Sequence, residues 1–272
     1  MTQNISNQPS NWQNFTVQFP VPSSRLSRDD LKLLYQILDE KQKEYRDKTM
    51  GLLSRMENES ERVFEQRKKS VFEAFVTSVT IRSENGASFS GNTDAVFDKS
   101  AFPKKVRSIF YSTQSVPEVV LKHTPLDRVQ VFLDFSQPPL LDLTRMPTLP
   151  THNESSFEIN AKTETWCVAA RAKLQEFFEE RRIRNNWLHL AGVYDVFLYF
   201  LAFPFAVLVS VRVGQHLTWL AKLDEFPKAL VYLYICFGSI IAYRLCFSYA
   251  RWAFPKFELE GRLNAQLCIE PQ

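Results

Sequence analysis

The sequence contains little glycine and little cysteine, and the short motifs that bind phosphate or metal ions are absent from it. Seven of its 272 residues are glycine and four are cysteine. It contains no G-x-x-x-x-G-K, H-E-x-x-H or G-x-S-x-G motif. The cysteines Cys167, Cys236, Cys246 and Cys268 form no C-x-x-C pair, which argues against a zinc site or a disulfide framework and fits a reducing environment. We therefore expect neither a metal nor a cofactor.

The sequence also lacks the strong positive charge of a nucleic-acid-binding domain. Its formal net charge is +3, whereas such domains usually carry a strongly basic face. The basic runs at 67–69 and 104–105 have no interleaved aromatic residue on which a base could stack. A third run, at 181–184, directly precedes an apolar segment, so lipid headgroups are its expected partner. We expect no nucleic acid partner.

Charged residues are scarce in the C-terminal third, where two apolar segments lie. Residues 188–255 hold eight of the 63 Asp, Glu, Lys and Arg residues. The segments 190–213 and 229–250 show no polar face at a period of 3.6 residues, and each is long enough, at about 1.5 Å per residue, to cross a hydrocarbon core of ~30 Å. Pro204 would kink the first helix, which membrane helices tolerate. We predict a two-pass transmembrane hairpin over 190–250, with the lipid bilayer as a partner.

The residues that flank these segments predict their orientation. The N-terminus lacks the basic and then apolar layout of a signal peptide. Arginines and lysines precede the first segment and follow the second, whereas the two lysines between the segments lie beside acidic residues. The positive-inside rule therefore places both termini in the cytoplasm. The predicted interface anchors are Trp187, Trp219, Trp252, Arg181, Arg182 and Arg184.

Asp195 and Arg244 lie within the apolar segments and form the predicted intramembrane pair. Asp195 lies 18 residues before the end of the first segment, and Arg244 lies 16 residues after Lys228, which precedes the second. In an antiparallel hairpin these positions reach nearly the same depth. An unpaired charge at the bilayer centre would cost roughly 2.5–3.5 kcal/mol. We predict that Asp195 pairs with Arg244, with independent snorkelling of each side chain to the interface as the alternative.

The first two thirds of the chain predict a small α+β domain. Residues 1–26 are rich in Asn, Gln, Ser and Pro and read as a flexible leader. Ser27 is the expected N-cap, and Asp30 is placed to bond back to its backbone amide. Helix-forming sequence continues from there to about Ser70. Its apolar stripe has heptad-like spacing, but lysine and arginine occupy the intervening seam positions. The pattern therefore favours one long, coiled-coil-like helix, laid on its own domain or bent near Gly51, over self-association through this seam.

Strand patterns follow this helix. We predict a hairpin over 71–91 with its turn at Glu84-Asn85-Gly86, a helical turn at 93–98, and strands at 106–113, 128–136 and 155–163. These elements complete a cytosolic α+β domain with a mixed or antiparallel sheet over 27–163. A connecting helix at 164–189, which we expect to couple the domain to the hairpin, and a cytosolic tail at 251–272 complete the predicted organisation.

Polar side chains near strand ends are the candidates for catalysis. They are His123, Asp134, Asp142, His152 and Glu154. No spacing ties these residues together, and carboxylates at strand ends are usually structural. The sequence therefore favours a protein without enzymatic activity, and we identify no catalytic residue.

The expected function is that of a membrane-anchored sensor or adaptor whose cytosolic domain recognises a protein or small-molecule partner. The alternative is an oligomeric, pore-forming effector gated by that domain, which requires a homo-oligomer because one hairpin cannot enclose a pore. An enzyme that acts at the membrane surface is a third hypothesis.

Overall fold

The computed structural model describes residues 15–57, 59–98, 102–122, 124–139 and 147–260. The chain divides into two compact units. The first, which we call the sheet unit, comprises residues 1–136, 154–182 and 257–272, and the second, the hairpin unit, comprises residues 137–153 and 183–256. The fold is therefore mixed α+β with two apolar helices in its C-terminal part, as the sequence predicts.

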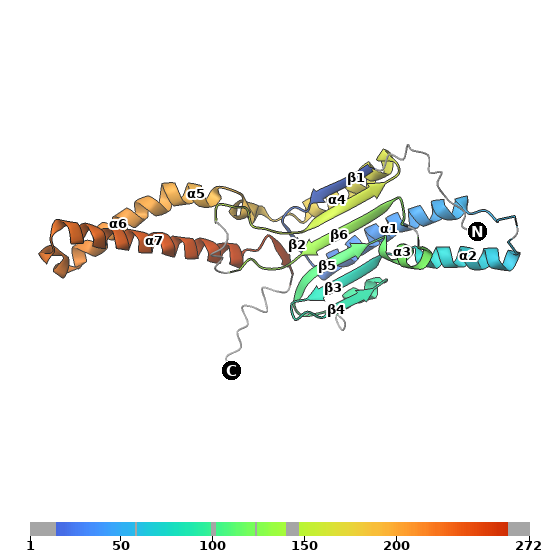
Figure 1. Ribbon diagram of the computed structural model, residues 1–272, viewed down its shortest axis with the longest axis horizontal. Coiled ribbons are helices and arrows are strands. Elements are labelled where there is room, and N and C mark those ends of the chain that lie inside the picture. The colour runs from blue at the N-terminus through green and yellow to red at the C-terminus, as the bar shows by residue number, and fades with distance from the viewer. Residues whose placement is uncertain (1–14, 58, 99–101, 123, 140–146, 261–272) are drawn as a thin grey trace, which may run out of the picture. The chain divides into compact units, whose positions relative to one another are not determined.

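The sheet unit is built from short strands and four helices (Figure 1). In chain order its elements are β1 (Phe15–Pro20), β2 (Ser24–Leu26), α1 (Arg28–Leu52), α2 (Glu61–Ala74), β3 (Ser78–Ser83), β4 (Ser88–Gly91), the 3-10 helix η1 (Asp94–Phe97), β5 (Val106–Ser112), α3 (Ser115–Leu121), β6 (Arg128–Asp134), β7 (Ser156–Ala161), α4 (Glu164–Glu180) and β8 (Phe257–Leu259).

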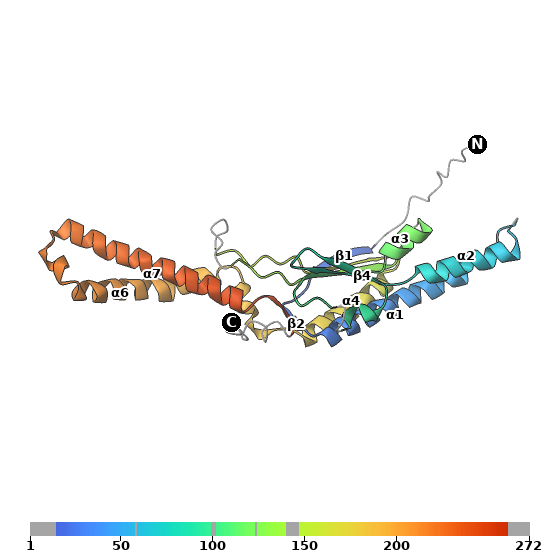
Figure 2. The same cartoon turned by 90° about the horizontal axis from the view of Figure 1, so that it is seen from below.

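Six of these strands form one antiparallel sheet in the described part of the chain, in the order β1-β7-β6-β5-β3-β4. Helices α1 and α4 lie against one face of this sheet (Figure 2). Alternation along β6 explains the arrangement, since Val129, Val131 and Leu133 are buried in the core while Gln130 and Phe132 are only half-buried on the opposite face. The antiparallel sheet is thus covered by helices on one side, as is common for α+β domains.

The predicted start of the first helix is confirmed. The Ser27 hydroxyl accepts a hydrogen bond from the Asp30 amide at 3.1 Å, and the Asp30 carboxylate accepts one from the Ser27 amide at 2.8 Å. These reciprocal bonds satisfy two helix donors that have no partner within the helix. Leu31, Leu34 and Leu38 of this first part of α1 are fully buried against the sheet.

The single helix expected from Ser27 to about Ser70 is not confirmed. The structure has two helices, α1 and α2, and the described residues between them, 53–57, 59 and 60, are not helical. Ser60 caps α2, which continues to Ala74 and so replaces the strand start that the sequence predicts at Val71. The expected bend near Gly51 is therefore a break into two helices, and the coiled-coil character of the stripe stays a prediction.

The leader and the tail take part in the fold where the structure describes them. Residues 15–26, which we expected to lack regular structure, form β1 and β2, and Leu26 is completely buried. That part of the leader prediction is wrong, because Phe15, Val17 and Phe19 alternate with polar residues at the period of a strand. β8, in the predicted tail, pairs in parallel with β2, and Arg25 forms an ion pair with Glu258 at 2.7 Å.

The predicted strands after α2 are confirmed with shorter bounds. β3 and β4 form the predicted hairpin, and Gly86 in its turn has a positive φ of 85°, a conformation that glycine adopts without strain. β5, β6 and β7 correspond to the other three predicted strands. The expected connecting helix is α4, which ends at Glu180, and its Leu174, Phe177 and Phe178 complete the core of the sheet unit.

The helical segments of the hairpin unit lie between residues 184 and 253. They are the 3-10 helix η2 (Arg184–His189), α5 (Val193–Phe197), the π-helical turn η3 (Leu198–Ala202), α6 (Phe203–His216), the 3-10 helix η4 (Thr218–Lys222) and α7 (Glu225–Ala253). Of these, α5, η3 and α6 follow one another without a break. α6 and α7 pack against each other as an antiparallel pair, as their contacts and both views of the chain show (Figures 1 and 2).

Candidate functional site

Two helices of the hairpin unit are long and apolar enough to cross a membrane. They cover Val193–His216, with a mean hydropathy of 2.2 in the most apolar window, and Glu225–Ala253, with a value of 1.8. The predicted segments 190–213 and 229–250 fall on these helices. The first helix contains the π-helical turn η3 directly before Pro204. A proline leaves a backbone carbonyl of the preceding turn without its hydrogen-bond donor, and a π-helical turn can provide another one. The kink predicted at Pro204 is therefore represented by this π-helical turn.

A close contact joins the two apolar helices near the turn between them. A Cβ atom added to Gly214 of α6 would lie 2.0 Å from Cε1 of Tyr232 on α7. Glycine therefore lets the aromatic ring approach the backbone of α6, in the way that small residues permit close packing of membrane helices. Gly238, by contrast, has nothing within 4 Å of such an added atom.

The opposite end of the hairpin is fastened to the loop that precedes β7. The Thr148 hydroxyl donates a hydrogen bond to the Asp195 carboxylate at 3.0 Å, and the Gly192 amide donates to the Thr148 carbonyl at 3.0 Å. Gly192 has a positive φ of 75°, which suits glycine at the start of α5. The sequence does not indicate that Thr148 is a partner of Asp195, because no local pattern relates two residues that are 47 positions apart.

A buried histidine and an arginine complete this end of the hairpin. The imidazole of His189 lies 2.9 Å from the Thr151 hydroxyl through Nδ1 and 2.8 Å from the Phe254 carbonyl through Nε2. Arg251 donates to the carbonyl oxygens of Leu188 and Leu149 at 3.0 and 3.3 Å. Thus η2, the end of α7 and residues 147–153 are held together by polar contacts, and we call this set the hairpin base.

The hydrogen bonds of His189 determine its protonation. The Phe254 carbonyl can only accept, so Nε2 carries the proton, and in the neutral ring Nδ1 accepts from the Thr151 hydroxyl. Burial lowers the pKa of His189 below its ordinary value, although the bond to the Phe254 carbonyl opposes this effect. Arg251 and Lys256 nearby lower the pKa further. The ring is therefore neutral at pH 7.

The predicted pair of Asp195 with Arg244 stays a prediction. Asp195 lies in α5 and is half-buried, with Thr148 as the hydrogen-bond donor described above. Arg244 lies in α7, where its side chain is also half-buried, one residue after Tyr243, whose hydroxyl donates to the Tyr194 carbonyl at 3.2 Å. The two charged residues thus belong to helices that contact each other beside the hairpin base.

The predicted interface anchors fall in different surroundings. Trp187 and Trp219 are about half exposed, at 46% and 51%, and Trp252 lies against Tyr249 with ring centroids 5.7 Å apart. Arg181 belongs to the sheet unit, where it forms an ion pair with Asp30 at 2.6 Å. Arg182 pairs with Glu179 at 3.1 Å. Arg184 begins η2. The anchor role of these residues stays a prediction, although Arg181 and Arg182 also have acidic partners within the protein.

Three of the candidates for catalysis, Asp134, His152 and Glu154, lie in the described part of the chain. His123 and Asp142 lie outside the described residues. Asp134 ends β6 and accepts a hydrogen bond from the Ser136 amide at 2.9 Å, and His152 and Glu154 are exposed. Among the described residues, no group of three or more His, Cys, Asp or Glu side chains is arranged to hold a metal ion.

A second feature, in the sheet unit, is the helical pair formed by the end of α1 and by α2. We call residues 43–74 the arm. Two arginines hold its connection. Arg67 contacts the Glu59 carboxylate at 2.9 and 2.8 Å and the Ser54 carbonyl at 2.8 Å, and Arg55 donates to the Glu59 carbonyl at 2.6 Å. The guanidinium of Arg46 lies 4.1 Å from the centre of the Phe72 ring, which joins the two helices. Of the residues of α2, all described, only Ala74 is buried.

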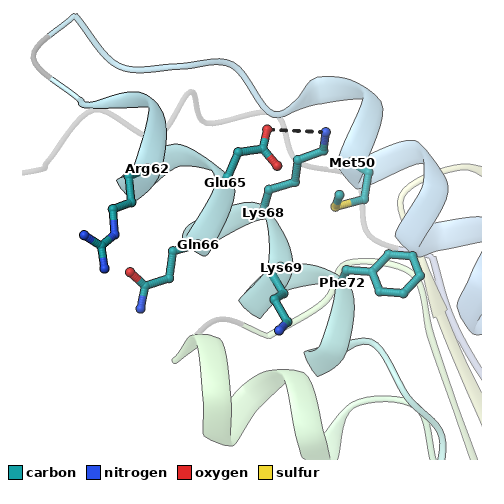
Figure 3. A pocket seen from close by; sticks show the side chains of 7 residues that line it. All are labelled: Met50, Arg62, Glu65, Gln66, Lys68, Lys69 and Phe72. Carbon is teal, nitrogen blue, oxygen red and sulfur yellow. Dashed lines mark ion pairs between the residues drawn. The ribbon is translucent and has the colours of Figure 1, made fainter.

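A shallow, largely open groove of about 640 Å³ lies on the arm, and Figure 3 shows the side chains that line it. Its lining combines two apolar side chains with charged and polar ones. The lining residues, which define the groove below, are Met50, Arg62, Glu65, Gln66, Lys68, Lys69 and Phe72. Three of them are cations and one is a carboxylate, so the groove is net positive.

No protein-family model, curated protein or solved structure matches this chain. The function therefore has to be inferred from the hairpin and the groove themselves.

Proposed function

We propose that this protein is a membrane-anchored sensor or adaptor. The hairpin crosses a lipid bilayer twice, and the sheet unit lies on the cytosolic side, where it recognises a partner. Three features support the proposal: the apolar surface of the hairpin, the charges that flank it and the contacts of the hairpin base.

The observation that carries the proposal is the exposure of the apolar helices. Only 17% of the most apolar window of the first helix and 6% of that of the second is buried inside the protein. A core helix of a soluble protein would bury most of such a window. Side chains as large as Phe200 and Tyr234 are 82% and 73% exposed. Soluble proteins rarely expose a continuous apolar surface of this extent, whereas hydrocarbon surrounds such a surface at no cost.

The flanking charges support the cytosolic placement. The basic residues that surround the hairpin outnumber those in its turn, where Asp224 and Glu225 offset Lys222 and Lys228. With this orientation Trp187 and Trp252 lie at the cytosolic interface and Trp219 at the other, and the exposed rings of Trp187 and Trp219 suit that position.

The hairpin base supports a coupling role. It fastens the membrane helices to residues 147–153, so a force that moves this loop reaches Asp195, His189 and Arg251 directly. We propose that partner recognition on the cytosolic side is coupled to the membrane hairpin through these contacts.

Membrane fractionation tests the proposal. After carbonate extraction of cells that express the full chain, we expect the protein in the membrane pellet. For orientation, the native cysteines are replaced by serine and single cysteines are introduced at Glu164 or at Asp224. A membrane-impermeant maleimide applied from the non-cytosolic side should label position 224 and spare position 164. Extraction into the supernatant would contradict the anchor, and the reverse labelling would contradict the orientation alone.

A further inference from the structure

We propose that the groove on the arm binds an acidic, amphipathic helix of a partner protein. The inference deepens the proposed function, on which it rests, by assigning the recognition surface and the chemical class of the partner. The groove residues are those defined above, contributed by the last turn of α1 and by one side of α2.

The shape of the groove suits a helix. It is elongated along α2, because Arg62, Gln66 and Lys69 follow one another at helical spacing along that element (Figure 3). Phe72 at one end is 48% exposed. Met50 and Phe72 are the two apolar side chains of the groove, and they can accept apolar side chains that a second helix presents at spacings of three and four residues. The openness of the groove favours such an extended ligand over a small molecule, which is usually enclosed.

The charges of the groove select an acidic ligand. Arg62 has no ion-pair partner among the described residues, and its side chain is exposed. Lys68 and Lys69 lie 3.9 and 3.8 Å from Glu65 and Glu73 in exposed ion pairs within the helix. Such pairs contribute little to stability, so carboxylates of a ligand can replace these partners at small cost. The three cations therefore complement a ligand whose polar positions carry Asp or Glu.

The groove is also formed before any ligand binds. A helix of α2's length is marginal on its own in water, and α2 buries only Ala74 of its described residues. Polar contacts hold it instead, since Arg67 joins α2 to both the Glu59 side chain and the Ser54 carbonyl. A surface held in place in this way loses little conformational entropy on binding, which raises affinity.

The same features argue against a bilayer as the ligand of the groove. A helix that lies on a membrane presents a convex apolar face flanked by cations to the lipids. Here Glu65 is one of the residues that line the groove, and its carboxylate would repel anionic headgroups. A protein helix can meet Glu65 with a basic residue of its own, whereas a lipid surface cannot.

A binding measurement with two synthetic helices tests the inference. The full chain is placed in nanodiscs of neutral phosphatidylcholine and titrated into a fluorescent 16-residue helical peptide of leucine, alanine and glutamate. A second peptide has lysine in place of every glutamate. We expect fluorescence anisotropy to report binding of the acidic peptide and at least about tenfold weaker binding of the basic one, a ratio equivalent to 1.4 kcal/mol.

Two double variants locate the binding surface. Arg62→Glu with Lys69→Glu reverses two exposed charges of the groove and should weaken the acidic peptide about tenfold or more while strengthening the basic one. Lys48→Glu with Lys104→Glu changes the net charge equally at exposed positions outside the groove, and should leave both affinities within about twofold.

Three results would overturn the inference. They are equal binding of both peptides, absence of binding to either, and equal effects of the two double variants. Competition by vesicles that contain phosphatidylserine, without acidic peptide binding, would assign the groove to a membrane surface instead. Because the nanodisc assay does not depend on orientation, a protein that remains in the carbonate pellet but binds no peptide contradicts this inference alone. A protein that is extracted by carbonate yet binds the acidic peptide contradicts the membrane anchor alone.

Discussion

The hairpin and the arm both expose large apolar side chains, but they do so in opposite chemical surroundings. Leu52 and Met56 in the arm are 84% and 64% exposed, and charged residues stand beside them along the chain, as Arg55 and Glu57 do. Leu208 in α6 is 64% exposed, and its neighbours from 196 to 211 carry no charge at all. Exposure alone therefore does not distinguish the two regions.

The difference between them lies in the solvent that each surface suits. In the arm, apolar and charged side chains alternate around the helices, so water and a partner protein can share the surface. On the hairpin the apolar side chains surround the helices, and a helix that is apolar on all sides has to be buried in protein or in lipid. The described structure buries little of it in protein.

The largest expected effect comes from placing the same charge in both regions. Leu208→Asp in α6 should cost up to about 3 kcal/mol of membrane insertion, because an aspartate would face hydrocarbon. Leu52→Asp in the arm should change stability by no more than about 0.5 kcal/mol, because water already surrounds that side chain. The fraction of each variant that resists carbonate extraction measures the contrast. If both variants are retained equally, the hairpin surface does not face lipid and the comparison fails.

Glycine substitutions test the packing within the hairpin. Gly214→Ala should destabilise the contact of α6 with α7 by about 1–3 kcal/mol, because the added carbon lies 2.0 Å from Cε1 of Tyr232. Gly238→Ala is the matched control and should be neutral or stabilising by about 0.5–1 kcal/mol, since it meets nothing within 4 Å and alanine favours the helix. Thermal unfolding in detergent compares them. Equal midpoints for the two variants would mean that the close approach of Tyr232 is absent.

Two double-mutant cycles compare charge pairing in the two units. For Asp195→Asn and Arg244→Gln in the hairpin we expect a coupling energy between the two substitutions of about 0.5–3 kcal/mol. If the two side chains pair away from water, removing one charge leaves the other without a partner. Arg25→Gln and Glu258→Gln in the sheet unit serve as the reference. Arg25 is 54% exposed there, so its coupling should be about 0.2–1 kcal/mol. Strict additivity in the hairpin cycle would favour two side chains that snorkel independently.

The elements that follow local rules were predictable from the sequence. The capping box at Ser27, the Asn-Gly turn and the strands β5 to β7 depend on residues that are close in sequence. Short motifs predict the cap and the turn, and an alternation of period two predicts the strands. The two apolar helices were predictable because their length and the absence of charge need no tertiary information.

The elements that depend on distant residues were not predictable. β2 is three residues long and exists because β8, more than 200 residues later, pairs with it. Asp195 has Thr148 as a partner through a loop whose path no local pattern describes. The break between α1 and α2 was missed because residues 53–60 contain no proline or glycine, and the Arg67 contacts that hold it become visible only in the fold. The groove depends on that break.

Hydrogen exchange should show how the arm is held. Arg67→Met removes the contacts to Glu59 and Ser54, so amides of α2 should exchange several-fold faster while those of β5 and β6 in the core stay unchanged. Arg62→Met removes a similar side chain that has no ion-pair partner among the described residues, and it should leave exchange in α2 unaltered. Similar exchange in the two variants would show that the arm is not fixed by Arg67, and the argument that the groove is preformed would lose its support.

The smallest expected effect is a difference in how the two units respond to mild acid. The pKa of His189 in the hairpin base is lowered by burial, so the unfolded state binds a proton more readily than the folded state. Stability is therefore greatest above the ordinary histidine pKa of about 6.5 and falls as the pH drops below it. In the sheet unit, burial alone would raise the pKa of Asp30, but hydrogen bonds from Ser27 and Arg181 lower it overall. That carboxylate supports folding at neutral pH and loses its contribution only below its ordinary value, near 4.

Between about pH 6.5 and 5, acid should thus weaken the hairpin base and leave the Asp30 contacts intact. Thermal unfolding in detergent over this range, followed by near-ultraviolet circular dichroism, should show a falling midpoint for the hairpin unit. His189→Gln keeps a donor for the Phe254 carbonyl but cannot take up a proton, so it should remove this dependence, whereas His216→Gln at an exposed position should retain it. A pH dependence that survives His189→Gln would show that another group takes up the proton, because the variant has no imidazole at this position.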